Sequence, residues 1–346
     1  MTGRSSVPPS LPPLGPRPVV SVVMPLRTAA AAAPRAVEAA LAQVPPVDEV
    51  VLSVSPDDSA TIEVARRLER DHDRIRVVDN PTGHTPDGLN AAIAAATGEV
   101  LVRVDAQAIL PPAYVKTALG ALRATGAANV GGLQVPAATT GFGRAVAAAM
   151  RSPFGAGGAA YRSATHPGPV DTVYLGVFRR AALDAVGGFD RRFRRNQDAE
   201  LNRRLTEAGY TVWLEPSMAV AYTPRDTVAG LVSQYWQYGR WRRLNVRVHS
   251  GSLRPRQLAA PVLVVGLTGA AVLSALRGTP FPVLAAAGGY AAALVVAGAI
   301  ASDRAKDILP TALALATMHL SWGVGFLVGP PRTTGPSSLS PVDADG

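Results

Sequence analysis

The sequence contains no cysteine among its 346 residues. Without thiols the protein has no disulfide framework, thiolate zinc site, iron–sulfur cluster or cysteine nucleophile. Aromatic residues make up only 5% and charged residues 17% of the chain, whereas 48% of the residues are hydrophobic. This composition excludes a mainly disordered polypeptide, and the length suffices for one large domain with additional segments.

Acidic residues are fewer than basic ones, with 25 Asp and Glu against 34 Lys and Arg, which leaves a net charge of +9. Many of the arginines lie just before the first long apolar run, where anionic lipid is the nearest partner, so we predict no nucleic-acid partner. The histidines form no pair spaced i, i+4, so a histidine-based zinc centre is not expected. The glycine-rich segments at 141–143 and 155–158 match neither a phosphate loop nor a dinucleotide fingerprint.

Long apolar runs occur only after Gln257, at 258–276, 281–301 and 308–328. Each run is long enough to cross a hydrocarbon core of roughly 30 Å, so we predict three transmembrane helices. Buried helices of a soluble core are the alternative, but consecutive charge-free runs of this length are rare there. Glycines within these runs suggest close helix packing. They are Gly266, Gly269, Gly288 and Gly289.

Basic residues flank the apolar runs on one side, and by the positive-inside rule that side is cytoplasmic. The sequence therefore predicts a multi-pass protein of the cytoplasmic (inner) membrane, with its preceding domain in the cytoplasm and its C-terminus outside. The membrane-flanking basic residues are Arg240, Arg242, Arg243, Arg247, Arg254, Arg256, Arg304 and Lys306.

Short β-rich runs alternate with Ala-rich helical patterns before the apolar region, which predicts an α/β domain with a mainly parallel sheet. Expected strands are 19–25, 49–54, 75–79, 100–105, 172–178 and 211–214, and expected helices are 61–70, 86–96 and 198–208. The predicted organisation is a flexible Pro- and Ser-rich arm (1–18), the α/β domain (19–225), an interfacial basic segment (226–257), three transmembrane helices (258–329) and a tail (330–346).

Asp105 ends the fourth expected strand, at the sheet edge where parallel α/β proteins bind ligands. A carboxylate there could hold a divalent cation that bridges a substrate diphosphate, although an aspartate after a strand is equally often a turn former.

Two further polar clusters could carry chemistry. Asp198 and Glu200 open an expected helix, where acids favour the helix dipole and where one of them could serve as a general base. The segment 234–241 is rich in aromatic residues next to the arginines, which is also typical of an aromatic belt at the membrane interface.

In combination, these motifs resemble those of family 2 glycosyltransferases with a GT-A fold, in particular membrane-bound exopolysaccharide glucosyltransferases of the succinoglycan type. The resemblance covers roughly residues 19–258. It rests on Ser21-Val22-Val23-Met24-Pro25, Asp79-Asn80-Pro81, Leu89-Asn90-Ala91-Ala92, Asp105-Ala106-Gln107, Val186-Gly187-Gly188-Phe189-Asp190 with Asn196-Gln197-Asp198-Ala199-Glu200, and Gln237-Tyr238-Gly239-Arg240-Trp241. Gln107 stands where the family's Asp-x-Asp metal motif has its second carboxylate.

The resemblance implies an inverting enzyme in which Asp198 deprotonates an acceptor hydroxyl. Asp105 would hold Mg2+ or Mn2+ and bind substrate, and the expected donor is a nucleotide sugar such as a UDP-hexose. The acceptor would be lipid-linked or a polysaccharide, at the cytoplasmic face of the membrane, with polysaccharide assembly proteins as possible partners. The remaining substrate-binding residues implied are Pro25, Asp79, Asn90, Gln237, Arg240 and Trp241. The alternative is a noncatalytic membrane scaffold of a polysaccharide assembly complex that retains the same fold.

Overall fold

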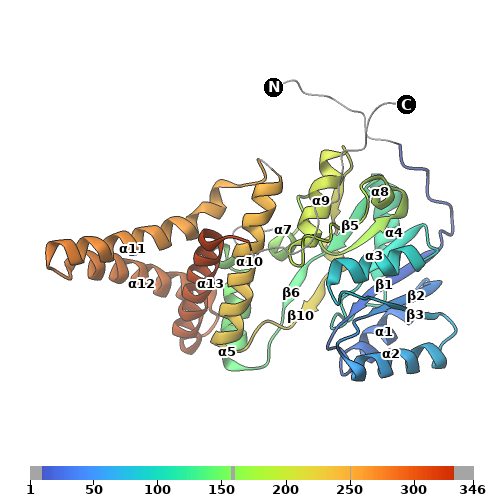
Figure 1. Cartoon of the computed structure of the whole chain (residues 1–346), viewed down its shortest axis with the longest axis horizontal. Coiled ribbons are helices and arrows are strands. Elements are labelled where there is room, and N and C mark those ends of the chain that lie inside the picture. The colour runs from blue at the N-terminus through green and yellow to red at the C-terminus, as the bar shows by residue number, and fades with distance from the viewer. Residues whose placement is uncertain (1–9, 157–159, 250, 331–346) are drawn as a thin grey trace.

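The computed structural model describes residues 10–156, 160–249 and 251–330. An α/β domain occupies one side of the molecule, and a helical part built from the C-terminal third of the chain extends from it (Figure 1).

The domain is built on an eight-stranded sheet of order β3-β2-β1-β4-β8-β5-β9-β7. The first four strands in chain order are parallel neighbours, whereas β8 runs antiparallel between β4 and β5. The mainly parallel sheet predicted from the sequence is confirmed, and the predicted strands end within two residues of the observed ones. The strands are β1 Val20–Leu26, β2 Glu49–Val54, β3 Ile75–Asp79, β4 Val100–Arg103, β5 Asn129–Gly132, β7 Gly168–Pro169, β8 Tyr174–Arg179 and β9 Val212–Leu214, with a small second sheet of β6 Gln134–Pro136 and β10 Val220–Tyr222.

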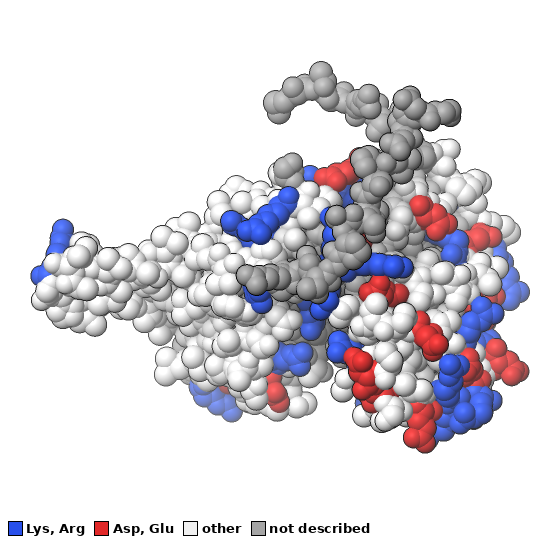
Figure 2. All heavy atoms as spheres, in the orientation of Figure 1, with Lys and Arg blue, Asp and Glu red and all other residues white. Residues whose placement is uncertain are grey.

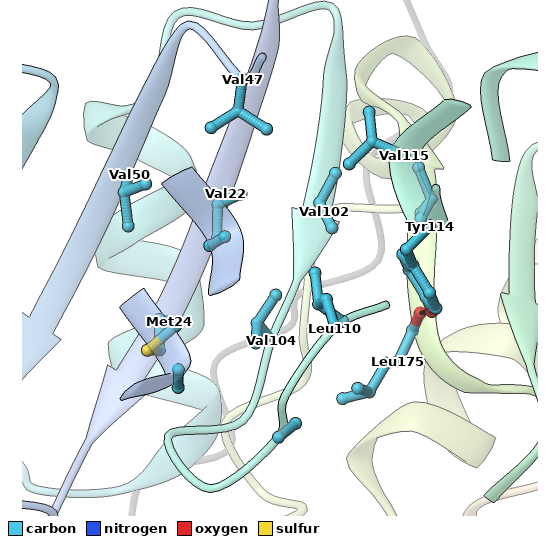
Figure 3. Packing of buried hydrophobic residues seen from close by; sticks show 14 of the residues in the cluster. Val22, Met24, Val47, Val50, Val102, Val104, Leu110, Tyr114, Val115 and Leu175 are labelled. Carbon is cyan, nitrogen blue, oxygen red and sulfur yellow. Dashed lines mark hydrogen bonds between the residues drawn. The ribbon is translucent and has the colours of Figure 1, made fainter. Parts of the chain in front are cut away.

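Both faces of the sheet are buried at the inner strands β1 and β4, because successive side chains of a strand point to opposite sides and most of both sets are apolar there. On one face Val22 and Met24 of β1 belong to the cluster drawn in Figure 3, which also includes the buried Tyr114. On the other face Val23 packs with Leu89. The helices of the domain are α1 Ala33–Leu41, α2 Ser59–Asp71, α3 Thr85–Ala95, α4 Tyr114–Thr125, α8 Arg180–Ala185 and α9 Gln197–Glu207.

Residues 10–18 lie against the domain. Leu11 and Leu14 pack against the two core clusters, and the Arg123 guanidinium donates to the carbonyls of Gly15 and Pro16 at 2.9 Å each. A freely flexible arm, as predicted for 1–18, would lack these contacts; residues 1–9 lie outside the described residues.

The helical part contains three helices long and apolar enough to cross a membrane, at the predicted positions. They are α11 Ala259–Arg277, α12 Phe281–Ala301 and α13 Ile308–Val328. The hairpin of α11 and α12 projects away from the domain, and in Figure 2 its surface carries no charge except a basic group at its tip. Such a surface suits a hydrocarbon environment.

The third of these helices, α13, differs from the other two. In its most apolar window 56% of the residues are buried within the protein, against 11% in α11 and 17% in α12. It runs beside α10 (Val228–Val248), across rather than along the α11–α12 hairpin in Figure 1, and it also packs on α5 (Gly141–Arg151). The apolar surface of α13 is therefore largely buried against other helices of the protein.

Glycines allow α10 and α13 to approach closely. A Cβ on Gly239 of α10 would lie 2.1 Å from the carbonyl oxygen of Trp322, and a Cβ on Gly325 of α13 would lie 2.3 Å from that of Trp236. A Cβ added to any of the four glycines predicted to mediate packing would meet no atom of another described segment within 4 Å, so that prediction is wrong for contacts within the described part of this chain. Helix approach depends on which face a glycine occupies, and only the tertiary structure determines that face.

Candidate active site

A cleft of about 1920 Å³ runs from the carboxyl ends of β1 and β4 to the helical part. Loops after parallel strands gather at one edge of the sheet, which is where this cleft opens. It is lined by six of the eight residues that the sequence predicts for catalysis, metal or substrate binding: Pro25, Asp105, Asp198, Gln237, Arg240 and Trp241.

A buried arginine joins the two aspartates of the cleft. Arg103, the last residue of β4, donates from one terminal nitrogen to Asp105 at 2.7 Å and from the other to Asp198 at 2.8 Å. Its side chain is only 6% exposed. A buried guanidinium between two carboxylates offsets their mutual repulsion and fixes the spacing of β4 and α9 at this point.

Asp198 lies in the first turn of α9, which begins after Asn196 in the left-handed backbone region at φ 60°. Its Oδ2 atom accepts from Arg103, whereas Oδ1 is buried without a hydrogen-bond partner among the described residues. Burial raises the pKa of Asp198, the Arg103 guanidinium opposes that rise, and the charge of Asp105 adds to it. The result is a carboxylate of increased basicity with one oxygen uncommitted, as proton abstraction requires.

Glu200, the other carboxylate of the cluster, is committed to structure. Its side chain is 1% exposed and accepts two bonds of 2.6 Å from Arg204. A ring nitrogen of His249, the residue that follows α10, lies 3.1 Å from it. Glu200 therefore connects α9 to the end of α10, which leaves Asp198 as the carboxylate of this pair that lines the cleft.

Asp79 and Asn90 lie away from the lining of the cleft. The Asp79 side chain is 89% exposed and lies 3.7 Å from Arg66. Asn90 donates to the Phe189 carbonyl at 2.7 Å and accepts from the Phe189 amide at 2.9 Å. Asn90 thus holds the turn that leads towards α9, a supporting position rather than a contact with the cleft.

The Gln-x-x-Arg-Trp motif occupies the middle of α10. Gln237 donates to Ser233 at 3.4 Å, and Arg240 donates to the carbonyl of Gly329, just after α13, at 2.9 Å. Arg240 also stacks over the Trp236 ring at 5.9 Å. Trp241 is buried, as is Tyr235, so these two rings are packed inside the protein and are not part of an interfacial aromatic belt. The motif joins the cleft to α13.

Arginines dominate the charge of the cleft, whose lining includes eleven of them and three aspartates. Such a surface suits ligands with several phosphate oxygens. Arg103 is absent from the predicted site residues, although a lone arginine in the apolar run Val100-Leu101-Val102-Arg103-Val104 indicates a buried partner. Arg162 is absent as well, because it lies in a short helical segment without a recognisable pattern.

Comparisons with known proteins agree on one family. The family model described as "Glycosyltransferase like family 2" matches residues 16–242. The succinoglycan biosynthesis protein ExoA of Rhizobium meliloti (strain 1021) is 31% identical over 281 residues, which cover 80% of this chain and 84% of that protein. The chain belongs to the family 2 glycosyltransferases, as its motifs predicted, and is therefore an enzyme.

A solved structure supports the fold independently. The mannosyltransferase PcManGT from Pyrobaculum calidifontis, solved in complex with GDP-Man and Mn2+, matches with a TM-score of 0.61 at 19% identity. The match covers 93% of this chain and 91% of that one. The predicted GT-A fold is thus confirmed.

Proposed function

We propose that the enzyme transfers a sugar from a nucleotide-sugar donor to an acceptor hydroxyl with inversion at the anomeric carbon, and that Asp198 is the general base. The Arg103 bridge carries this proposal, because it holds Asp198 beside Asp105 on the cleft wall and leaves Asp198 Oδ1 uncommitted. The acceptor oxygen gives its proton to Asp198 and bonds to the anomeric carbon. The bond from that carbon to the diphosphate breaks, and its electron pair leaves with the nucleoside diphosphate.

One carboxylate base suffices for this reaction. A glycosidase needs a second carboxyl group to protonate its leaving group, whereas a diphosphate leaves as an anion. The arginines that line the cleft can accept that anion, and Arg240 of the Gln-x-x-Arg-Trp motif offers a forked phosphate contact. We propose that Pro25, Gln237 and Trp241 contact donor or acceptor in the same cleft.

The cleft also suits a divalent cation. The described residues contain no cluster of three or more His, Asp or Glu side chains that could hold a metal alone. Mg2+ and similar ions in phosphate sites take one or two carboxylates together with substrate oxygens and water, and Asp105 supplies one such carboxylate. Mg2+ or Mn2+ held by Asp105 and the donor would neutralise the charge that develops on the leaving diphosphate.

Replacing Asp105 with alanine tests the metal site. We expect transfer to fall by about 10² or more and the residual activity to lose its response to Mg2+ or Mn2+, since the protein ligand is gone. The measurement is nucleoside diphosphate release by detergent-purified protein with a panel of nucleotide sugars and a lipid extract as acceptor. Asp184→Ala, on the exposed side of α8, is the matched control. Full activity with unchanged metal dependence in Asp105→Ala would refute the assignment, and a panel without any turnover would contradict the proposed classes of donor and acceptor.

We propose that the acceptor is lipid-linked or a polysaccharide, and that the enzyme adds the sugar to it at the membrane surface in exopolysaccharide or envelope glycan synthesis. The lining of the cleft continues from Asp198 onto Ala259 and Leu263 of α11, so an acceptor could reach the base from the membrane. The named relative acts in succinoglycan biosynthesis. Polysaccharide assembly proteins are the partners that such a role implies.

We propose that the α/β domain faces the cytoplasm and that the α11–α12 hairpin crosses the membrane. Because the chain has no cysteine, single introduced cysteines report topology without background. We expect Thr279→Cys, at the hairpin tip, to react with an impermeant maleimide from outside intact cells, and Asp73→Cys in the domain to react only after lysis. Reaction of Asp73→Cys in intact cells would reverse the orientation. Three spans require that α13 also crosses the membrane. In that case Ser337→Cys should react with the maleimide from outside intact cells.

A further inference from the structure

Arg162, in the short helix α7 (Ala160–Ser163), lines the cleft without an acidic partner. Its Nε atom is buried and has no hydrogen-bond partner, and no carboxylate pairs with its guanidinium among the described residues. The guanidinium lies over the Tyr161 ring at 5.5 Å. Burying an arginine costs free energy unless an anion or hydrogen-bond acceptors compensate. The position therefore fits an anionic ligand that enters from the cleft.

Tyrosine hydroxyls surround this arginine. Gln234 donates to the hydroxyl of Tyr222 at 2.8 Å and to that of Tyr238 at 3.2 Å. The Tyr235 hydroxyl is buried against the Arg162 guanidinium and has no other hydrogen-bond partner among the described residues. Burial raises the pKa of Tyr235 and of Tyr238 above the usual value, so these hydroxyls stay protonated and can donate. One cation and several hydroxyl donors suit a group with many acceptor oxygens, such as a phosphate.

Arg162, Tyr222, Tyr235 and Tyr238 form what we call the Arg162 cluster. Its surroundings are apolar on the side of the candidate membrane helices. The lining of the cleft continues onto Leu263 of α11 and onto Met318 and Trp322 of α13, both helices being apolar enough to cross a membrane. A ring nitrogen of His319 on α13 lies 3.0 Å from the carbonyl of Phe154, in the segment just before α7. The Arg162 cluster thus stands where the polar cleft meets candidate membrane helices.

We infer that Arg162 and Tyr235 bind the phosphate or diphosphate of a lipid-linked acceptor, while its hydrocarbon chain lies along α11 and α13. This inference rests on the proposed glycosyl transfer to a membrane acceptor and specifies its class. In this assignment the donor diphosphate binds separately, at Asp105, which lines the same cleft. A free inorganic phosphate could use the same donors, but it would gain nothing from the apolar lining.

The test is a binding measurement that does not depend on catalysis. Asp198→Asn protein in detergent is titrated with farnesyl diphosphate, farnesol, inorganic diphosphate and UDP. We expect farnesyl diphosphate to bind at least tenfold more tightly than either farnesol or inorganic diphosphate. Adding Arg162→Gln should weaken farnesyl diphosphate binding about tenfold or more and leave UDP binding unchanged. Arg67→Gln, an exposed arginine of α2, is the matched control and should bind as the parent does.

Each outcome bears on the inference. Unchanged farnesyl diphosphate binding in Arg162→Gln would overturn it, as would inorganic diphosphate binding as tightly as farnesyl diphosphate. A parallel loss of UDP binding would assign Arg162 to the donor instead. If Arg162→Gln does not fold, Tyr235→Phe serves instead, because it removes one hydroxyl and changes no charge. A selective weakening of farnesyl diphosphate binding by about threefold or more would support the inference. Unchanged binding in this variant would oppose it. Absence of sugar transfer by the unaltered protein would contradict the proposed function but would not alter these binding results.

Discussion

Replacing Asp198 with asparagine is expected to lower the rate of sugar transfer by roughly 10² to 10⁴-fold, the usual contribution of a general base. Asparagine has nearly the same shape and its side-chain oxygen can still accept a hydrogen bond from Arg103. It cannot, however, take the proton of the acceptor hydroxyl. The cleft and its arginines stay in place, so the affinity for the donor should change little. Steady-state kcat and a separate titration with the nucleoside diphosphate distinguish these two effects.

Glu207→Gln is the control for this substitution, because it removes a carboxylate from the same helix at an exposed position that contacts Arg203 and His249. It should transfer sugar at the normal rate. Near-normal transfer by Asp198→Asn, or loss of donor binding together with transfer, would refute the assigned role.

The pH profile offers a related check. The base must be ionised, so activity falls as the pH drops through the pKa of Asp198. That pKa is raised in the folded protein. The fall should therefore begin at a higher pH than for an ordinary aspartate, whose pKa is near 3.9. The acid limb should be missing from the residual activity of Asp198→Asn.

Replacing Gly239 with alanine is expected to destabilise the helical part and to reduce transfer about tenfold or more. The added Cβ would stand 2.1 Å from the Trp322 carbonyl and 2.7 Å from the Phe326 amide, both backbone atoms that cannot move aside. Forcing α10 and α13 apart should cost about 1–3 kcal/mol, and it would displace Gln237 and Arg240, which flank the glycine on α10. Thermal unfolding in detergent and the transfer assay measure the two effects.

Gly266→Ala is the matched control, since a Cβ added to this glycine of α11 would meet no atom of another described segment within 4 Å. Alanine is intrinsically the better helix former by about 1 kcal/mol, so this variant should be as stable as the parent or more so. A Gly239→Ala protein with unchanged stability and activity would show that α10 and α13 do not depend on this contact.

Local patterns determined a large part of the structure. The valine-rich runs became the parallel strands, because a strand covered on both faces must be apolar throughout. The charge-free runs became α11, α12 and α13 at the predicted positions, since length and hydropathy are properties of the segment alone. Motif order likewise identified the family, and Asp105, Asp198 and Arg240 line one cleft.

Contacts between distant segments were decided only by the tertiary structure. Arg103 and Asp198 are 95 residues apart, and nothing in either segment indicates that they pair. The same is true of Asn90, which the fold commits to the Phe189 backbone, and of Glu200, which it commits to Arg204 and His249. The sequence by itself determined the strands, the apolar helices and the chemistry available, because these follow from the order of side chains along the chain. Which glycine faces a neighbouring helix, which carboxylate stays uncommitted and which arginine lacks an acid depend on packing in three dimensions, and only the folded structure established them.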